Sequence, residues 1–160
     1  MEASTRKLWL ARQTAERGIT FEDEIRPGAH YEVAVEHEGQ IWVSGQIPRV
    51  QGRIVVTGRV GEDVSLDQAR HAAEVSTLRA LAILQARLGC LSRVARVLRM
   101  TVYVQSSAGF TQQSEVADAA SALLYGAFAP SGGHTRTSVG VYQLPKNAAV
   151  ELDFVFALAR

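Results

Sequence analysis

Apolar and polar residues alternate in two consecutive segments near the C-terminus. In the first segment, Val139 and Val141 alternate with polar or small residues, among them Arg136. In the second segment, every even-numbered position from 150 to 158 is apolar, and Glu151 lies between two of them. Side chains of a strand point alternately to its two faces. Both segments are therefore predicted to be strands that turn one face toward a core.

Pro145 lies in the turn predicted between these two strands. If the strands pair as an antiparallel hairpin, Arg136 and Glu151 lie close together on the face away from the core. In that arrangement Arg136 and Glu151 could also form only a structural ion pair. A guanidinium beside a carboxylate on a face with little other charge is a candidate site for a small molecule.

Apolar residues at helical spacing predict a short N-terminal helix over about 5–17 and a second helix over about 111–128. The clearest helix begins after Ser65, where Ser65 and Gln68 fit a capping box, and it ends at Gly89. Further strands are predicted at 31–37, 41–44, 53–57 and 94–104.

After the N-terminal helix, the predicted order is β-β-β-α-β-α-β-β. This order is typical of an α+β domain in which two helices cover one face of a mixed sheet. The other face carries Val155 and Ala157 beside Arg136, Glu151 and Asp153, which is too apolar to be fully solvated. Because exposed apolar patches mark interfaces, we infer that this face is covered by oligomerisation.

The amino-acid composition excludes several classes of function. A chain of 160 residues, 47% of them hydrophobic, is expected to form one domain with a sizeable core. Its net charge of +1 gives no general attraction to nucleic acid or to an anionic membrane. No apolar run suits a membrane span or a signal peptide, so a cytoplasmic protein is expected. Cys90 is the single cysteine and no histidine pair has metal-ligand spacing, so we expect no metal and no cofactor.

Several motifs in the chain resemble the Rid family, also called YjgF and often labelled endoribonuclease L-PSP or translation-initiation inhibitor. The matching segments are Ser44-Gly45-Gln46-Ile47-Pro48, Thr101 to Val104, Phe110, and Arg136 to Glu151 with its Leu-Pro-Lys turn. Residues 30–160 would then form a Rid-like domain, and residues 1–29 a helix and extension like that of a longer branch of the family. The resemblance implies a chorismate-mutase-like homotrimer with three clefts between subunits.

The resemblance also implies an activity and a set of site residues. Members of the RidA type hydrolyse reactive 2-imino and enamine acids to 2-keto acids and ammonia. By the match, Arg136 holds the substrate carboxylate and Glu151 lies near the water that attacks the imine carbon. The residues implied to line the ligand are Tyr31, Ser44, Gly45 and Gln46.

Two further positions of the implied site depart from typical members of the family. Ser114 stands where those members have an asparagine, and Ser138 stands where a cysteine is common. The chain is therefore expected to be an imine or enamine hydrolase, or else a non-catalytic trimer that binds a small carboxylate. A ribonuclease is the third alternative, and the near-neutral charge and lack of a His/His or His/Lys pair in the motif argue against it.

Overall fold

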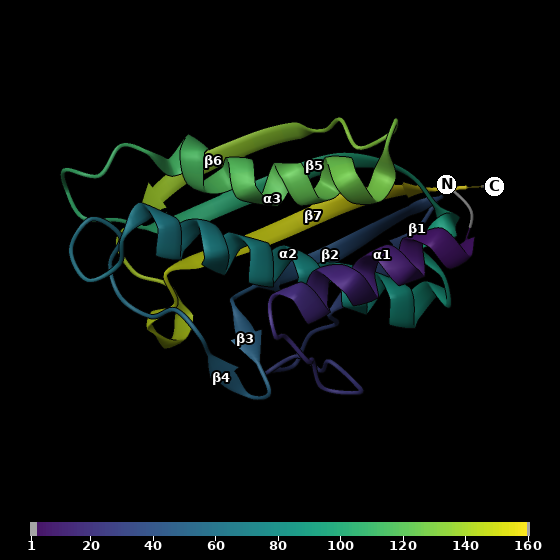
Figure 1. Ribbon diagram of the computed structural model, residues 1–160, viewed down its shortest axis with the longest axis horizontal. Helices are drawn as coiled ribbons and strands as arrows, with labels where there is room; N and C mark the ends of the chain where they lie inside the picture. Colours follow the sequence, from purple (N-terminus) through teal and green to yellow (C-terminus); the bar gives the residue numbers. More distant parts are fainter. Residues whose placement is uncertain (1–2, 160) are drawn as a thin grey trace.

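The computed structural model describes residues 3–159, which form a five-stranded main sheet with helices on a single face and a separate two-stranded hairpin. Figure 1 shows helices α2 and α3 side by side across the sheet, with α1 beside α2. The helices are α1 (Ala3–Glu16), α2 (Leu66–Leu88) and α3 (Gln113–Phe128), with short 3-10 turns η1 (Leu91–Arg93) and η2 (Pro145–Asn147). Strands of the main sheet are β1 (Ala34–His37), β2 (Gln40–Gln46), β5 (Val94–Gln105), β6 (Thr135–Val141) and β7 (Val150–Leu158).

The main sheet has the strand order β1-β2-β7-β5-β6, and β6 is parallel to β5 while the other pairs are antiparallel. The predicted α+β class, with a mixed sheet and helices on one face, is confirmed. The strand predicted at 53–57 does not join this sheet. Instead β4 (Arg53–Ile54) pairs with β3 (Arg49–Val50) in a small separate hairpin.

The predicted hairpin of the two C-terminal strands is wrong, because β5 lies between β6 and β7. Helix α3 connects β5 to β6, and a strand–helix–strand unit places its two strands parallel and adjacent. The chain then crosses the end of β5 through η2, and β7 takes the central position between β2 and β5.

This topology puts Arg136 and Glu151 on opposite faces of the sheet. Arg136 pairs with Met100, a fully buried residue of the helix-covered face, and its side chain reaches α3. Glu151 alternates with buried Val150 and Leu152 and lies on the open face. The prediction that both charges face away from the core is therefore confirmed for Glu151 and wrong for Arg136.

The N-terminal segment packs onto the same core as the rest of the chain. Leu10 and Ile19 are buried in it. The Arg6 guanidinium donates to the backbone oxygens of Leu91 and Val94 at 2.9 and 2.8 Å. Figure 1 shows the loop after α1 running beside the β3–β4 hairpin. The segment thus forms part of one folded unit with the domain that follows.

The open face of the sheet carries a row of apolar side chains. Val35 of β1 pairs with Trp42 of β2, which pairs with Val155 of β7. Val35 and Trp42 are 51% and 55% exposed in the single chain. Such a row suits a protein interface, and the predicted oligomer stays a prediction. Among residues 3–159, no helix has the length and apolar character needed to cross a bilayer.

Candidate functional site

A cleft of about 310 Å³ opens beside Glu151. Its walls come from six parts of the chain: residues 26–33, the end of β2, β3, the middle of α2, η2, and the start of β7 with Glu151. The volume is at the small end of the range for metabolite sites, ~300–1,000 Å³. Of the site residues implied by the resemblance, it brings together Tyr31, Gly45, Gln46 and Glu151.

Glu151 is the acidic residue of the cleft wall. Burial raises the pKa of its carboxyl group above the ordinary glutamate value, and the nearby charge of Asp153 adds to the effect. Within the described chain, no side chain or backbone group donates a hydrogen bond to this carboxylate. The backbone of Gly45 passes so close that a Cβ there would overlap the carboxylate, which explains the need for glycine. Glu151 is thus a half-buried, unpaired acid that faces the cleft.

Asp153 and Tyr103 flank Glu151 on the open face. Burial also raises the pKa of Asp153, although hydrogen bonds from Thr101 and Tyr103 and the charge of Arg99 act in the opposite direction. The pKa of Tyr103 is raised by burial and by the two neighbouring carboxylates. This face therefore holds protons more readily than ordinary side chains of the same types.

Gln46 and Arg79 form the back of the cleft. Arg79 extends from α2 and is 5% exposed. Its Nε donates to Gln46 Oε1 at 3.1 Å, and its Nη1 donates to the backbone oxygen of Arg49 at 3.0 Å. The same Nη1 contacts both carboxylate oxygens of Glu22, at 3.3 and 3.0 Å. Burial lowers the pKa of Arg79, and Glu22 partly offsets this effect. Gln46 is therefore fixed by a buried arginine.

Ser44 and Tyr31 occupy the rim. The Ser44 hydroxyl donates to the backbone oxygen of Glu32, so it fastens the segment before β1 and is not part of the cleft lining. Tyr31 lines the cleft and is 51% exposed. The Ser-Gly-Gln segment thus contributes to the cleft through Gly45 and Gln46.

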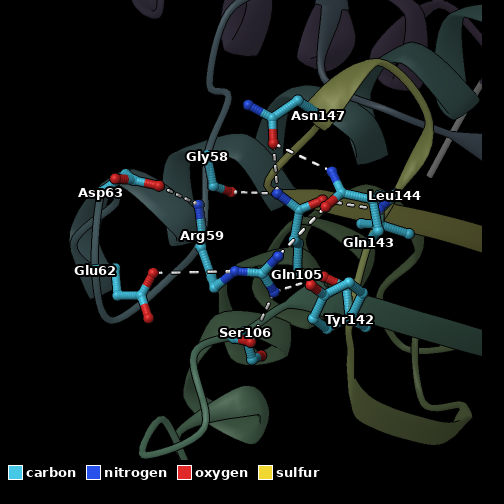
Figure 2. A network of polar contacts seen from close by, with 10 residues as sticks. All are labelled: Gly58, Arg59, Glu62, Asp63, Gln105, Ser106, Tyr142, Gln143, Leu144 and Asn147. Carbon is cyan, nitrogen blue, oxygen red and sulfur yellow. Dashed lines mark hydrogen bonds and ion pairs between the residues drawn. The ribbon is translucent and has the colours of Figure 1, made fainter.

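Figure 2 shows a polar network that holds Leu144 and Asn147 at the two ends of the η2 turn. Pro145 and Lys146 of this turn form another wall of the cleft. At the centre of the network, the buried Gln105 Nε2 donates to the Gly58 oxygen at 3.0 Å and to Asn147 Oδ1 at 2.7 Å. Gln105 Oε1 accepts the backbone N–H of Leu144 at 2.7 Å. One side chain therefore joins β5, the loop before α2 and the connection from β6 to β7.

Arg59 closes the outer side of the same network (Figure 2). Its guanidinium donates to the backbone oxygens of Ser106 and Tyr142 and to Gln143 Oε1, and it lies 4.8 Å from the centre of the Tyr142 ring. Tyr142 is nevertheless 85% exposed. The network fixes the backbone of the turn and leaves this ring on the surface.

Arg136 belongs to a different cluster, on the helix-covered side of edge strand β6. Its Nη1 donates to Asp118 Oδ1 at 2.8 Å and to Ser121 Oγ at 3.1 Å. Ser121 Oγ is also 3.0 Å from His134 Nε2, and His134 Nδ1 is 2.7 Å from the Gly132 oxygen. His134 thus contacts the backbone of the loop before β6.

Ser114 and Ser138 lie beside this second cluster, with their hydroxyl oxygens 3.5 Å apart. Glu151 is two strands and three residue positions away from Arg136, because it pairs with Tyr103 while Arg136 pairs with Met100. With the usual strand spacings this offset is roughly 14 Å, in addition to the difference of face. In a single chain, the implied site is therefore divided into two halves.

The sequence did not indicate that four cationic side chains line the cleft: Arg26, Arg49, Arg79 and Lys146. One signal was available: Arg79 occurs within the apolar run of its helix, and a buried charge requires a partner. Its partner Glu22 is 57 positions away, so residue spacing could not identify it. Arg49 directly follows the Ser-Gly-Gln-Ile-Pro motif, but no local pattern marks it as part of a cleft.

The five-stranded mixed sheet with helices on one face and a cleft at the end of its central strand defines an α+β protein of the chorismate-mutase-like type. Residues 20–159 match the family model described as "YjgF/chorismate_mutase-like, putative endoribonuclease". The chain therefore belongs to the YjgF family.

Known relatives cover nearly the whole chain. Protein TCP17 of Trypanosoma cruzi is 39% identical over 142 residues, which are 88% of this chain and 89% of that protein. The crystal structure of Atu1372 from Agrobacterium tumefaciens, a protein of unknown function, superimposes with a TM-score of 0.88 at 33% identity and covers 98% and 97% of the two chains. E. coli TdcF with bound serine has the same fold, with a TM-score of 0.59, 22% identity and coverage of 87% and 98%.

Proposed function

We propose that the protein hydrolyses reactive 2-imino and enamine acids to 2-keto acids and ammonia in clefts between the subunits of a homotrimer. The observation that carries this proposal is Glu151, a half-buried and unpaired carboxylate with a raised pKa at the wall of a metabolite-sized cleft. The bound serine of E. coli TdcF supports it, since a protein of the same fold accommodates a small amino acid.

The chemistry requires one group that accepts and then returns a proton. Glu151 takes a proton from water as the water oxygen bonds to the carbon of the protonated imine, which gives a neutral carbinolamine. Glu151 then returns this proton to the nitrogen, and ammonia leaves as the C–N bond breaks. The hydroxyl proton of the carbinolamine passes to the released ammonia, which leaves the keto acid and an ammonium ion. A carboxyl group with a pKa raised toward the working pH suits both steps. The imine carbon is already electrophilic, so positioning supplies much of the remaining acceleration.

The carboxylate of the substrate is assigned to Arg136 of a neighbouring subunit. Arg136 and Glu151 of one chain lie on opposite faces of its sheet, so one chain does not present both to one ligand. Arg136 lies on edge strand β6 and keeps part of its side chain exposed. A ligand carboxylate would replace Asp118 as its partner, with two parallel hydrogen bonds to the guanidinium. The exposed row Val35–Trp42 offers the apolar surface for assembly.

The activity is tested by generating 2-iminopropanoate from alanine with an amino-acid oxidase, with and without the protein. Release of pyruvate and ammonia should accelerate in proportion to the protein added. Glu151→Gln and Arg136→Ala should each abolish the acceleration while the fold, followed by circular dichroism, is unchanged. An acceleration that persists in Glu151→Gln would overturn the mechanism.

Subunit complementation tests the shared site. Arg136→Ala and Glu151→Gln chains are each inactive as homotrimers, but co-expressed chains can pair an intact Arg136 with an intact Glu151 at one interface. About a quarter of the sites in randomly mixed trimers would then carry both groups, because each site draws on two adjacent subunits of a closed ring. Mixed trimers without activity would contradict a site shared in this way.

A second candidate function is binding of a small carboxylate without turnover. It is favoured by Ser114, whose hydroxyl lies 3.5 Å from that of Ser138 where typical members of the family have an asparagine. In this case 2-keto acids should raise the melting temperature of the wild type and not of Arg136→Ala, and no imine should be turned over. Stabilisation accompanied by imine hydrolysis would exclude this alternative.

A further inference from the structure

The cleft beside Glu151 carries more positive charge than the proposed reaction uses. Four cationic side chains line it, and Glu151 is its one acidic lining residue. Arg79 is neutralised by Glu22, with their nearest atoms 3.0 Å apart. Arg26 is paired with Glu24 at 2.6 Å. Two lining cations, Arg49 and Lys146, have no ion pair with any residue in the range 3–159.

Arg49 is held in place by its backbone. It pairs with Ile54 in the β3–β4 hairpin, its N–H donates to the Ile47 oxygen at 2.7 Å, and its own oxygen accepts from Arg79 at 3.0 Å. The hairpin turn places Gln51 and Gly52 at φ +49° and +78°, the left-handed pair typical of a tight two-residue turn. The base of the Arg49 side chain is therefore fixed next to the cleft.

The Arg49 side chain has a buried nitrogen, Nε, that lacks a hydrogen-bond acceptor among residues 3–159. Its Nε is shielded from solvent and makes no hydrogen bond to the described residues. A buried donor without an acceptor is unfavourable and is uncommon in folded proteins. Arg49 also lies close enough to contribute, after burial, to the lowered pKa of Arg79. An anion in the cleft would supply the missing acceptor and relieve the repulsion between the two guanidinium groups.

Lys146 faces the same cleft from η2. Its backbone adopts φ +58°, and the following Asn147 is held by Gln105 and by the Gly58 N–H, which donates to the Asn147 oxygen at 2.9 Å. Arg49 and Lys146 therefore approach from two separately anchored walls. The guanidinium of Arg49 offers a planar pair of donors, and the flexible ammonium of Lys146 adds a second point of charge.

We propose that Arg49 and Lys146 form an anion subsite, so that the ligand of this cleft carries a second anionic group besides the carboxylate assigned to Arg136. The ligand class is a small acid with two anionic groups: an imino or keto dicarboxylate, or a carboxylate that bears a phosphate. The identity of the reacting group rests on the proposed function, whereas the subsite is a property of binding and is measured without turnover.

The test compares three probes by isothermal titration calorimetry: pyruvate, 2-oxoglutarate and phosphoenolpyruvate. At least one dianion should bind tenfold or more tightly than pyruvate, since a charge-assisted hydrogen bond contributes a factor of about ten or more. If 2-oxoglutarate alone is preferred, the second group is a carboxylate. If phosphoenolpyruvate alone is preferred, it is a phosphate.

Arg49→Met should remove the preference for the dianion and leave pyruvate binding unchanged. Lys146→Met should reduce the preference, and it provides a second variant at an exposed position if Arg49→Met does not fold. Arg53→Met is the matched control: it removes the same charge from the adjacent strand β4, outside the cleft, and should retain the preference.

Equal affinity for all three probes, or a preference that survives both Arg49→Met and Lys146→Met, would overturn the subsite. Failure of the proposed reaction gives a different pattern: the dianion still binds more tightly and depends on Arg49, but no imine is hydrolysed. Conversely, hydrolysis of 2-iminopropanoate without any preference for a dianion would support the reaction and overturn the subsite.

Discussion

Replacing Gln105 by methionine tests whether one buried amide holds the turn that forms a wall of the cleft. Gln105 is 1% exposed, and its side chain makes three hydrogen bonds, to Gly58, Leu144 and Asn147. Methionine matches its length and volume without either polar group. The substitution therefore removes the bonds with little change in packing.

The expected loss of stability follows from the backbone groups that no longer have a hydrogen-bond partner. Asn147 Oδ1 keeps a contact with the Gln143 amide at 3.3 Å, but the Gly58 oxygen and the Leu144 N–H lose the partner that Gln105 provides. Each buried, unsatisfied backbone group costs ~1–3 kcal/mol. The polar amide of Gln105 no longer has to be buried in the folded protein, and this offsets ~1 kcal/mol of the loss. The net loss in the free energy of unfolding is about 3 kcal/mol.

Urea unfolding at one fixed protein concentration measures this loss, because the stability of the proposed oligomer would depend on concentration. The melting temperature should fall by roughly 6–12 °C for a chain of this size. Gln143→Met is the control, since its amide is exposed and bonds only at the rim of the same network. If Gln105→Met costs no more than Gln143→Met, the network does not hold the turn. Affinity for dianions should also fall in Gln105→Met, because Lys146 is carried on that turn.

Four further substitutions test other parts of the structure. Glu22→Gln should lower the free energy of unfolding by ~2–3 kcal/mol, less than for a fully buried pair because Glu22 is 29% exposed; an unchanged urea midpoint would contradict this. Gly45→Ala should weaken ligand binding in calorimetry, because its Cβ overlaps the Glu151 carboxylate. Since burial raises the pKa of Glu151, the folded wild type loses stability as pH rises from the ordinary glutamate pKa through the raised one; Glu151→Gln should reduce that loss in thermal melts, and Asp153, whose pKa is also raised, should account for a remaining part. Trp42→Glu should dissociate the proposed oligomer in sedimentation, and an unchanged mass would argue against assembly through the open face.

Local signals were sufficient to predict the helices. Ser65 and Gln68 form the expected reciprocal cap, with Gln68 N–H to Ser65 Oγ at 3.2 Å and Ser65 N–H to Gln68 Oε1 at 2.9 Å. Gly89 ends the same helix with φ +76°. Such features depend on residues within one or two turns of each other, and they are therefore visible in a single sequence.

Strand pairing was harder to predict, because neighbours in the chain need not be neighbours in the sheet. β6 and β7 are consecutive but unpaired, and the alternation of Val139 and Val141 turned out to mark the open face. The helix between β5 and β6 was the overlooked signal, since a helical connection favours parallel, adjacent strands. With β6 beside β5, the position of Arg136 opposite buried Met100 would have followed.

Only the cleft residues that belong to a sequence motif were named as candidates from the sequence. Gly45, Gln46 and Glu151, which belong to the motifs, line one cleft, whereas Arg49 and Arg79 reach this cleft through contacts between distant parts of the chain. Periodicity shows that a helix face is buried, but it does not show what a charged residue on that face will contact. Long-range ion pairs therefore remained hidden until the fold was known.

The residue proposed to react and the residues that give the cleft its positive charge lie on different structural elements. Glu151 lies on the central strand β7, whose register is set by two neighbouring strands. Apart from Arg79 of α2, the cationic lining comes from the N-terminal segment, the β3–β4 hairpin and η2, none of which belongs to the main sheet. Substitutions in these peripheral elements can therefore change the charge preferred in a ligand without moving the Glu151 carboxylate. Residues 26–29 contribute to the cleft wall and Glu22 neutralises Arg79, so the segment before β1 helps to set both the shape and the charge of the cleft beside Glu151.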